Sequence, residues 1–228
     1  MHPYIAGVSV PVHEESADPN VSDERQRPRE NAQSQSPGRQ VLRLFIGIPL
    51  AAATASDLAA AVHRLRSKAA PQTLRWSAPE SWHITLQFLG STTLQQYECV
   101  TAHLRELHHP PIQIRLATLD TFDRAGVLFV DVPVTPELLA LQQAVTAATA
   151  PCGFTPEMRP YHPHITLARR KGKGGGRELR SLKLQSDPPP RLSTFTAENF
   201  VLYESIATSE GSRYEIRERF LFRAGYPE

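Results

Sequence analysis

The tetrapeptide His-Ile-Thr-Leu occurs twice in this chain, at His83–Leu86 and again at His164–Leu167. Each copy follows a segment with helical periodicity, and each is followed by a second such segment and by a pair of alternating, strand-like segments. A repeat this long is not that of a solenoid. It predicts one α+β unit used twice, with the two copies related by a pseudo-twofold axis.

The predicted elements follow from hydrophobic periodicity and turn residues. In the first copy they are a leading strand 42–49, a helix 51–69, a strand around 83–90, a helix 94–107, and strands 112–119 and 127–132. In the second they are a helix 135–150, a strand around 164–168, a short helix 177–184, and strands 195–204 and 214–222. We expect a bilobal α+β fold, with antiparallel sheets lining a central groove, helices outside, and lobes of about 41–133 and 134–228.

Composition limits the remaining possibilities. Residues 1–40 are polar with almost nothing to bury, so we expect a disordered tail, and they lack the pattern of a secretory signal. No apolar run reaches the ~18 residues of a membrane span. Cys99 and Cys152 form no C-x-x-C pair, so we expect neither a disulfide framework nor a thiolate zinc site. The net charge of +2 does not by itself indicate a nucleic-acid binder.

The two motifs carry the chemistry. Side chains alternate along a strand, so each Ile and Leu faces the core while each His and Thr lies on the other face. If the copies pack about a twofold axis, two imidazoles and two hydroxyls converge across one groove. Two histidines with pKa values near ~6.5 act as a base and an acid, which suits displacement at phosphorus. Thr85 and Thr166 would donate to the phosphate oxygens.

Arg169 lies three residues after Thr166, and an arginine fork matches phosphate. No acidic cluster accompanies either histidine, so we expect no metal and no cofactor. His162 and His164 form an H-x-H pair, but no third ligand is near in the sequence.

A structural interpretation competes with the functional one. A single His-x-Thr on a strand is most often a surface or core-edge feature. A purely structural duplication, however, would preserve Ile and Leu, while the residues on the polar face would come to differ between the two copies. Two identical copies in phase with the repeat therefore favour a functional pair.

The paired motif resembles the signature of the 2H phosphoesterases, and its context resembles their RNA 2′,3′-cyclic phosphodiesterase branch, also called 2′-5′ RNA ligases. The matching stretches, between about Val41 and Phe222, are RLFIGIPL, LRW followed by HITLQFLG, and RPYHPHITLAR. The resemblance implies metal-independent opening of a 2′,3′-cyclic phosphate at an RNA end to a 2′-phosphate, with reverse 2′-5′ ligation chemically allowed. It makes His83 the proton donor and His164 the proton acceptor, with Thr85, Thr166 and Arg169 holding the phosphate.

Two rival functions stay open. A sister 2H enzyme would act on cyclic nucleotides, ADP-ribose cyclic phosphate or 2′-5′ oligoadenylate. A non-catalytic RNA-binding module would use the same groove, although binding alone would not require both imidazoles. For the leading interpretation we expect a cytoplasmic monomer whose partner is RNA ending in a 2′,3′-cyclic phosphate, with no membrane contact.

Aromatic and basic neighbours of the motifs are further candidates. Phe88 and Tyr161 could stack on a nucleobase. Phe88 is an odd number of residues from His83, so strict alternation favours the core for it, while Tyr161 stays open between the two roles. The basic loop 169–177 would either grip an RNA backbone or serve as a solvated linker.

Overall fold

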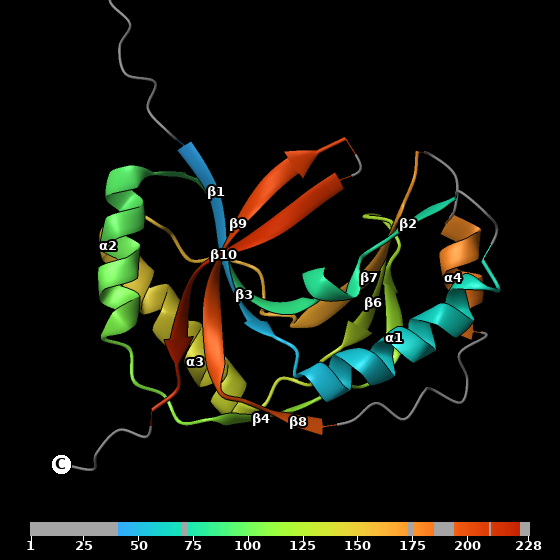
Figure 1. The fold of residues 1–228 in the computed structure, drawn as a ribbon, viewed down its shortest axis with the longest axis horizontal. Coiled ribbons are helices and arrows are strands. Elements are labelled where there is room, and N and C mark those ends of the chain that lie inside the picture. Colours follow the sequence, from blue (N-terminus) through green and yellow to red (C-terminus); the bar gives the residue numbers. More distant parts are fainter. Residues whose placement is uncertain (1–40, 70–72, 173–175, 185–193, 210, 224–228) are drawn as a thin grey trace, which may run out of the picture. The chain divides into compact units, whose positions relative to one another are not determined.

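The computed structural model describes residues 41–69, 73–172, 176–184, 194–209 and 211–223 (Figure 1), so the predicted tail 1–40 lies outside the described residues. The strands are β1 (Val41–Pro49), β2 (Leu74–Trp76), β3 (His83–Thr93), β4 (Ile112–Arg115), β5 (Leu119–Phe122), β6 (Val127–Asp131), β7 (His164–Arg170), β8 (Thr194–Ala197), β9 (Asn199–Thr208) and β10 (Gly211–Leu221). The helices are α1 (Ala52–Arg66), α2 (Leu94–Arg105), α3 (Pro136–Thr149) and α4 (Gly176–Leu184), with 3₁₀ turns η1 (Pro79–Ser81) and η2 (Ala150–Cys152). None of the described helices is both long and apolar enough to span a bilayer.

Two four-stranded antiparallel sheets organise these elements and confirm the α+β class. Their strand orders are β10-β9-β1-β3 and β2-β7-β6-β5, and β4 pairs with β8 in a small third sheet. Each large sheet takes strands from both halves of the chain: β9 and β10 join β1, while β5 and β6 join β7. The expected lobes 41–133 and 134–228 are therefore wrong as contiguous halves, because strand edges pair by proximity in space and not by order along the chain.

The helices form where capping and apolar stripes predict them. Thr93 caps α2 in a capping box, in which its hydroxyl accepts from Gln96 N and the Gln96 side chain accepts from Thr93 N. Thr135 accepts from Leu138 N at the start of α3, and Pro136 occupies the first helical position. Helices α2 and α3 contact each other and β3, while α4 contacts β5 and β6.

The apolar half of each motif lies in the core as predicted. Ile84, Leu86, Ile165 and Leu167 are all at most 3% exposed, and they join one hydrophobic cluster that includes residues of both large sheets. The histidine and threonine of each copy are half-buried. The alternation of H-I-T-L therefore places its polar pair on the face away from this cluster.

Both motif strands contain a β-bulge at the leucine of H-I-T-L. In β3 the register jumps from Thr85 to Gln87, so Leu86 has no partner in β1. In β7 it jumps from Thr166 to Ala168, so Leu167 has no partner in β6. An extra residue in a strand reverses the phase of alternation beyond it. Residues after each leucine therefore exchange faces.

The bulge corrects the prediction for Phe88. Strict alternation predicts the core face, but Phe88 is 62% exposed. Phe88 pairs with Phe45, whose ring lies 4.6 Å from that of His83, so Phe88 lies on the histidine face of the sheet. The prediction was wrong because a bulge cannot be read from hydrophobic alternation alone.

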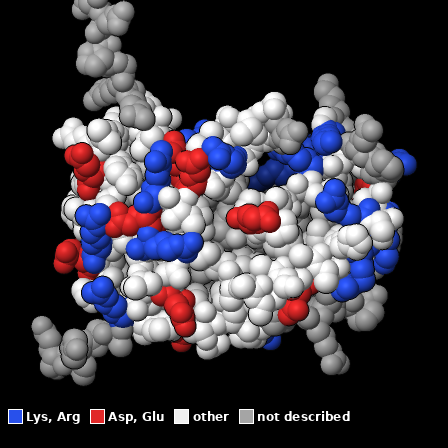
Figure 2. Space-filling view, viewed as in Figure 1, with Lys and Arg blue, Asp and Glu red and all other residues white. Residues whose placement is uncertain are grey.

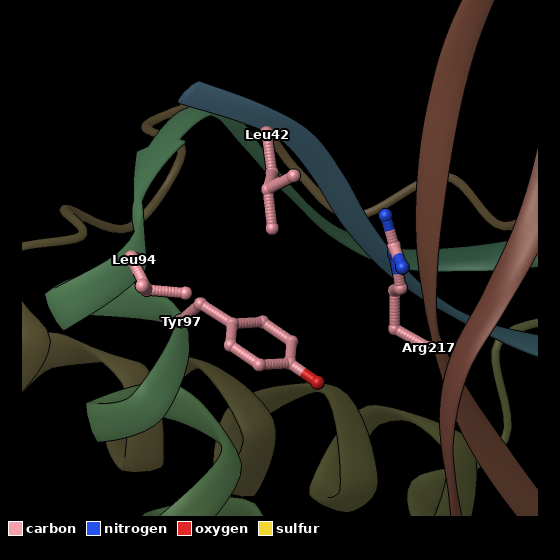
Figure 3. Close-up of a pocket in the computed structure, with 4 residues that line it drawn as sticks. All are labelled: Leu42, Leu94, Tyr97 and Arg217. Atoms are coloured by element: carbon pink, nitrogen blue, oxygen red, sulfur yellow. The ribbon is translucent and has the colours of Figure 1, made fainter. Parts of the chain in front are cut away.

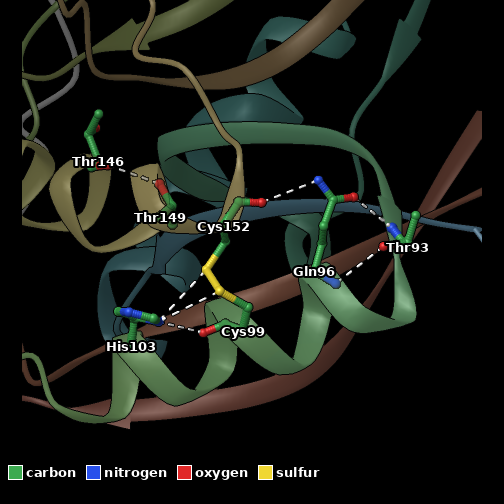
Figure 4. Close-up of a disulfide and its surroundings, with 7 residues drawn as sticks. All are labelled: Thr93, Gln96, Cys99, His103, Thr146, Thr149 and Cys152. Atoms are coloured by element: carbon green, nitrogen blue, oxygen red, sulfur yellow. Dashed lines mark hydrogen bonds between the residues drawn. A yellow bond between two sulfur atoms is a disulfide. The ribbon is translucent and has the colours of Figure 1, made fainter.

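The cysteines also depart from expectation. Cys99 of α2 and Cys152 of η2 form a disulfide (Figure 4), with 5.7 Å between their Cα atoms. The side chain of Gln96 donates to the Cys152 carbonyl at 3.3 Å, and His103 Nδ1 lies 3.8 Å from each sulfur. The sequence analysis, which expected no disulfide framework, did not foresee this single bond, because local spacing tests only nearby pairs and these two cysteines are 53 positions apart.

Candidate active site

His83 begins β3 and lies in an aromatic environment. Its ring centroid lies 4.6 Å from that of Phe45, 5.2 Å from that of Tyr214 and 5.6 Å from that of Tyr203. The Nδ1–H group donates to the Ser81 carbonyl at 2.7 Å, since a carbonyl only accepts. This bond leaves Nε2 as the atom that gains or loses a proton. Burial lowers the pKa of His83 to about 4, although the bond to Ser81 opposes the shift.

His164 begins β7 in a matching environment. Its ring contacts Phe122 and Phe129 edge-on, with centroids 5.0 and 5.2 Å away. Its Nδ1–H group donates to the His162 carbonyl at 2.8 Å. Burial is the main cause that lowers the pKa of His164, and the nearby Asp131 carboxylate opposes this shift. Each motif histidine is therefore fixed by the carbonyl two residues before it, with Nε2 left for chemistry.

The two histidines and Arg169 form one electrostatic cluster. The charges of His164 and Arg169 both lower the pKa of His83, and Arg169 also lowers the pKa of His164. These effects are smaller than that of burial. The positive charges in this cluster repel one another, which lowers the pKa of each histidine. A bound anion would attract the charged form of each histidine and would therefore raise both pKa values. The repeat therefore brings its two imidazoles within electrostatic range of each other, in a setting that favours a negatively charged ligand.

The other predicted phosphate contacts lie on the same faces. Thr166 pairs with Phe129 and Arg169 pairs with Val127, two residues along β6, so both side chains leave the same side of the sheet. The bulge at Leu167 produces this arrangement. Thr85 lies two residues after His83 and is half-buried like it. No hydrogen bond within the described residues engages the hydroxyl of either threonine.

Tyr161 connects the two motif strands. Its hydroxyl, just before β7, donates to the Thr85 carbonyl in β3 at 3.1 Å. Its ring packs at the edge of the main core, and burial raises the pKa of the hydroxyl far above its usual value. Tyr161 thus has a structural contact beside any contact with a nucleobase.

Sequence reasoning missed several residues around the histidines. They are the aromatic residues Phe45, Tyr203 and Tyr214 beside His83, and Phe122 and Phe129 beside His164. Only the stretch RLFIGIPL pointed to any of them, through Phe45. It also missed the contact between His162 Nε2 and Asp131 Oδ1 at 2.9 Å.

Small cavities lie elsewhere on the described part of the surface. One of about 180 Å³ is lined by Leu42, Leu94, Tyr97 and Arg217 (Figure 3). Another of about 320 Å³ lies beside α1 and β2 and is lined in part by Trp76 and Trp82. Neither motif histidine lines either cavity. Figure 2 shows a hollow in the molecular surface where Lys and Arg side chains gather.

Comparison with known proteins agrees with the fold and the paired motif. The model of the 2′-5′ RNA ligase superfamily matches residues 54–207, a span that contains both copies of H-I-T-L. The chain therefore belongs to the 2′-5′ RNA ligase superfamily.

Its relatives share one name. The RNA 2′,3′-cyclic phosphodiesterase of Bacillus subtilis (strain 168) is 30% identical over 131 residues, which cover 55% of this chain and 70% of that protein. The protein of the same name from Escherichia coli (strain K12) is 24% identical over 180 residues, covering 78% of this chain and 95% of that protein. The crystal structure of E. coli LigT in apo form has the same fold, with a TM-score of 0.66, 24% identity, and coverage of 81% of this chain and 99% of that one.

Proposed function

We propose that this chain is an RNA 2′,3′-cyclic phosphodiesterase that opens the cyclic phosphate at an RNA end to leave a 2′-phosphomonoester. The observation that carries the proposal is the matched pair His83 and His164. Each has Nδ1 bonded to the carbonyl two residues before it, and both interact electrostatically with Arg169. The relatives named above support the substrate class.

The two histidines divide the proton transfers. His164 Nε2 takes a proton from water as the water oxygen bonds to phosphorus. The bond from phosphorus to O3′ breaks, and His83 Nε2–H gives its proton to O3′. The product carries a 2′-phosphate and a 3′-hydroxyl. If the 5′-hydroxyl of a second RNA attacks in place of water, the same steps form a 2′-5′ linkage.

Substrate binding supplies the protonation state that the acid needs. Burial holds the pKa of His83 at about 4 in the free protein, so the ring is neutral at pH 7. A phosphate anion placed beside it favours the charged form and raises this pKa.

Thr85, Thr166 and Arg169 would hold the phosphate. The threonine hydroxyls donate to the non-bridging oxygens, where charge increases in the transition state. The Arg169 guanidinium, exposed on the histidine face, adds a planar pair of donors. No step of this scheme uses a metal, and we propose that the enzyme acts as a metal-free monomer in the cytoplasm.

Phe88 is the better candidate for stacking on a nucleobase. Its ring is 62% exposed, and its centroid lies 6.1 Å from that of Phe45 on the histidine side of the sheet. Stacking of a base on an aromatic ring contributes ~1–3 kcal/mol. Tyr161 would add a second surface through its ring, while its hydroxyl stays bonded to Thr85.

The test is hydrolysis of RNA that ends in a 2′,3′-cyclic phosphate, with the position of the product phosphate determined by NMR. We expect a 2′-phosphate, and we expect His83→Ala and His164→Ala each to lower kcat by about 10²–10⁴-fold. His108→Ala is the matched control, because His108 Nδ1 also donates to the carbonyl two residues earlier but lies on an exposed turn. A 3′-phosphate product, or full activity in either motif variant, would overturn the proposal. Inhibition by EDTA that Zn²⁺ reverses would refute the metal-free mechanism.

A further inference from the structure

A line of basic side chains extends from the histidine cluster to the edge of the second sheet. We call Arg75, Arg169, Lys171 and Arg177 the basic strip; all four are exposed. Arg75 in the edge strand β2 pairs directly with Arg169 in β7. Lys171 follows two positions on, and its backbone N–H donates to the Thr73 carbonyl at 2.9 Å.

The strip continues onto α4. The Thr73 hydroxyl donates to Glu178, in the first turn of α4, so this turn lies beside the start of β2. Arg177 precedes Glu178 and is exposed there. Figure 1 shows the same neighbourhood, with α4 beside the start of β2. Arg75, Arg169 and Arg177 thus come from β2, β7 and α4, and Lys171 directly follows β7, so the four cations lie along one edge of the sheet.

Among the described residues, the neighbouring cations Lys183 and Arg180 lie near carboxylates, whereas the cations of the strip do not. Lys183 contacts Asp120 at 2.5 Å, and Arg180 lies 3.8 Å from Asp123. Within the described part of the chain, no carboxylate lies within 4.0 Å of a basic atom of any strip residue. Like charges side by side on paired strands are unfavourable by themselves. The pair Arg75 and Arg169 therefore fits a surface whose charge is completed by a bound polyanion.

Arg75 also reaches across to the other large sheet. A Cβ atom added at Gly211, which begins β10 beyond the β9–β10 turn, would lie 3.3 Å from Arg75 Nη1. The guanidinium thus packs against the backbone of this hairpin. One member of the strip therefore lies where the two sheets approach each other, and the others lead outward from that point.

We propose that the basic strip binds the sugar-phosphate backbone of the RNA body, upstream of the terminal cyclic phosphate. The inference rests on the proposed function and adds to it a path for the rest of the substrate. Alternate residues along an extended strand are ~7 Å apart, so Arg169 and Lys171 offer successive positions to a strand of phosphates. Contacts of this kind position RNA without reading its sequence. The enzyme would then favour RNA over a mononucleotide while tolerating many sequences.

The test uses Lys171→Gln/Arg177→Gln, because neither residue belongs to the histidine cluster. Binding of a 12-nucleotide single-stranded RNA with an ordinary 3′-hydroxyl is followed by fluorescence anisotropy between 50 and 200 mM salt. Loss of two phosphate contacts lowers the slope of log Kd against log salt by about 1.4. Over this range the Kd of the unaltered protein should therefore rise about sevenfold more than that of the variant.

A matched control removes the same charge elsewhere. Arg43→Gln/Arg115→Gln neutralises two exposed arginines of β1 and β4, outside the strip, and its salt dependence should equal that of the unaltered protein. Hydrolysis of a 2′,3′-cyclic mononucleotide should stay within twofold in both double variants.

Each outcome decides a different point. Equal slopes for the strip variant and the control would overturn the inference while leaving the proposed function intact. A matching loss on the mononucleotide would also overturn it, because the strip would then act on the terminal phosphate. If neither the unaltered protein nor the two double variants hydrolysed cyclic phosphates, the proposed function would fail. The anisotropy measurement would still decide whether the strip binds RNA.

Discussion

The Cys99–Cys152 disulfide gives the prediction with the most direct magnitude. The bond joins α2 to the turn after α3 and closes a loop between residues 53 positions apart. In the chain-entropy account, a cross-link stabilises mainly by restricting the unfolded chain, and a loop of this length corresponds to about 4 kcal/mol. Reduction should therefore lower the free energy of unfolding by about 4 kcal/mol, or the Tm by about 8–16 °C for a protein of this size.

The assay compares urea unfolding of four proteins: the unaltered chain, Cys99→Ala, Cys152→Ala, and the double variant. Removing either sulfur abolishes the same bond, so the two single variants and the double variant should lose nearly the same stability. Dithiothreitol should destabilise only the unaltered protein. Thiol titration of the unfolded, unreduced protein should find neither cysteine free.

Two results would refute this reasoning. If the two single substitutions had effects that added in the double variant, the cysteines would act as independent apolar side chains and not as one bond. If dithiothreitol left the unfolding midpoint of the unaltered protein unchanged, the pair would be reduced in the native protein. In that case the Cys99, Cys152 and His103 side chains would be separate groups in contact.

Two further predictions concern His83 and its surroundings. Burial lowers the pKa of His83 from its ordinary value of 6.5 to about 4. Between these two pH values the unfolded chain therefore binds more protons than the folded one. The free energy of unfolding should consequently fall as the pH drops through this window. Urea unfolding of His83→Gln should show a flatter pH dependence there, and an identical profile would contradict the assigned burial. Gly47→Ala would place a Cβ atom 2.9 Å from the Ile84 carbonyl oxygen and 3.3 Å from His83 Cδ2, so we expect a loss of about 1–3 kcal/mol in stability together with a lower kcat. A stable Gly47→Ala protein with unchanged kcat would show that β1 shifts without moving His83.

The sequence predicted the elements around the motifs well because their signals are local. Thr135 followed by Pro136 marks the start of α3, and alternation placed Ile84 and Ile165 in the core. Phe88 was assigned to the wrong face because the bulge at Leu86 depends on the register with β1, which alternation within β3 does not contain. The same kind of bulge at Leu167 places Arg169 on the histidine face.

The sequence by itself determined the duplicated motif, the chemical character of His83 and His164, and the family to which such a pair belongs. Only the tertiary structure decided which strands share a sheet, which cysteines bond, and which aromatic rings surround each histidine. Those properties arise from pairings between residues far apart along the chain, and hydrophobic periodicity carries information only about near neighbours. The path proposed for RNA is of the second kind, since Arg75, Lys171 and Arg177 meet only after β2, β7 and α4 have packed together.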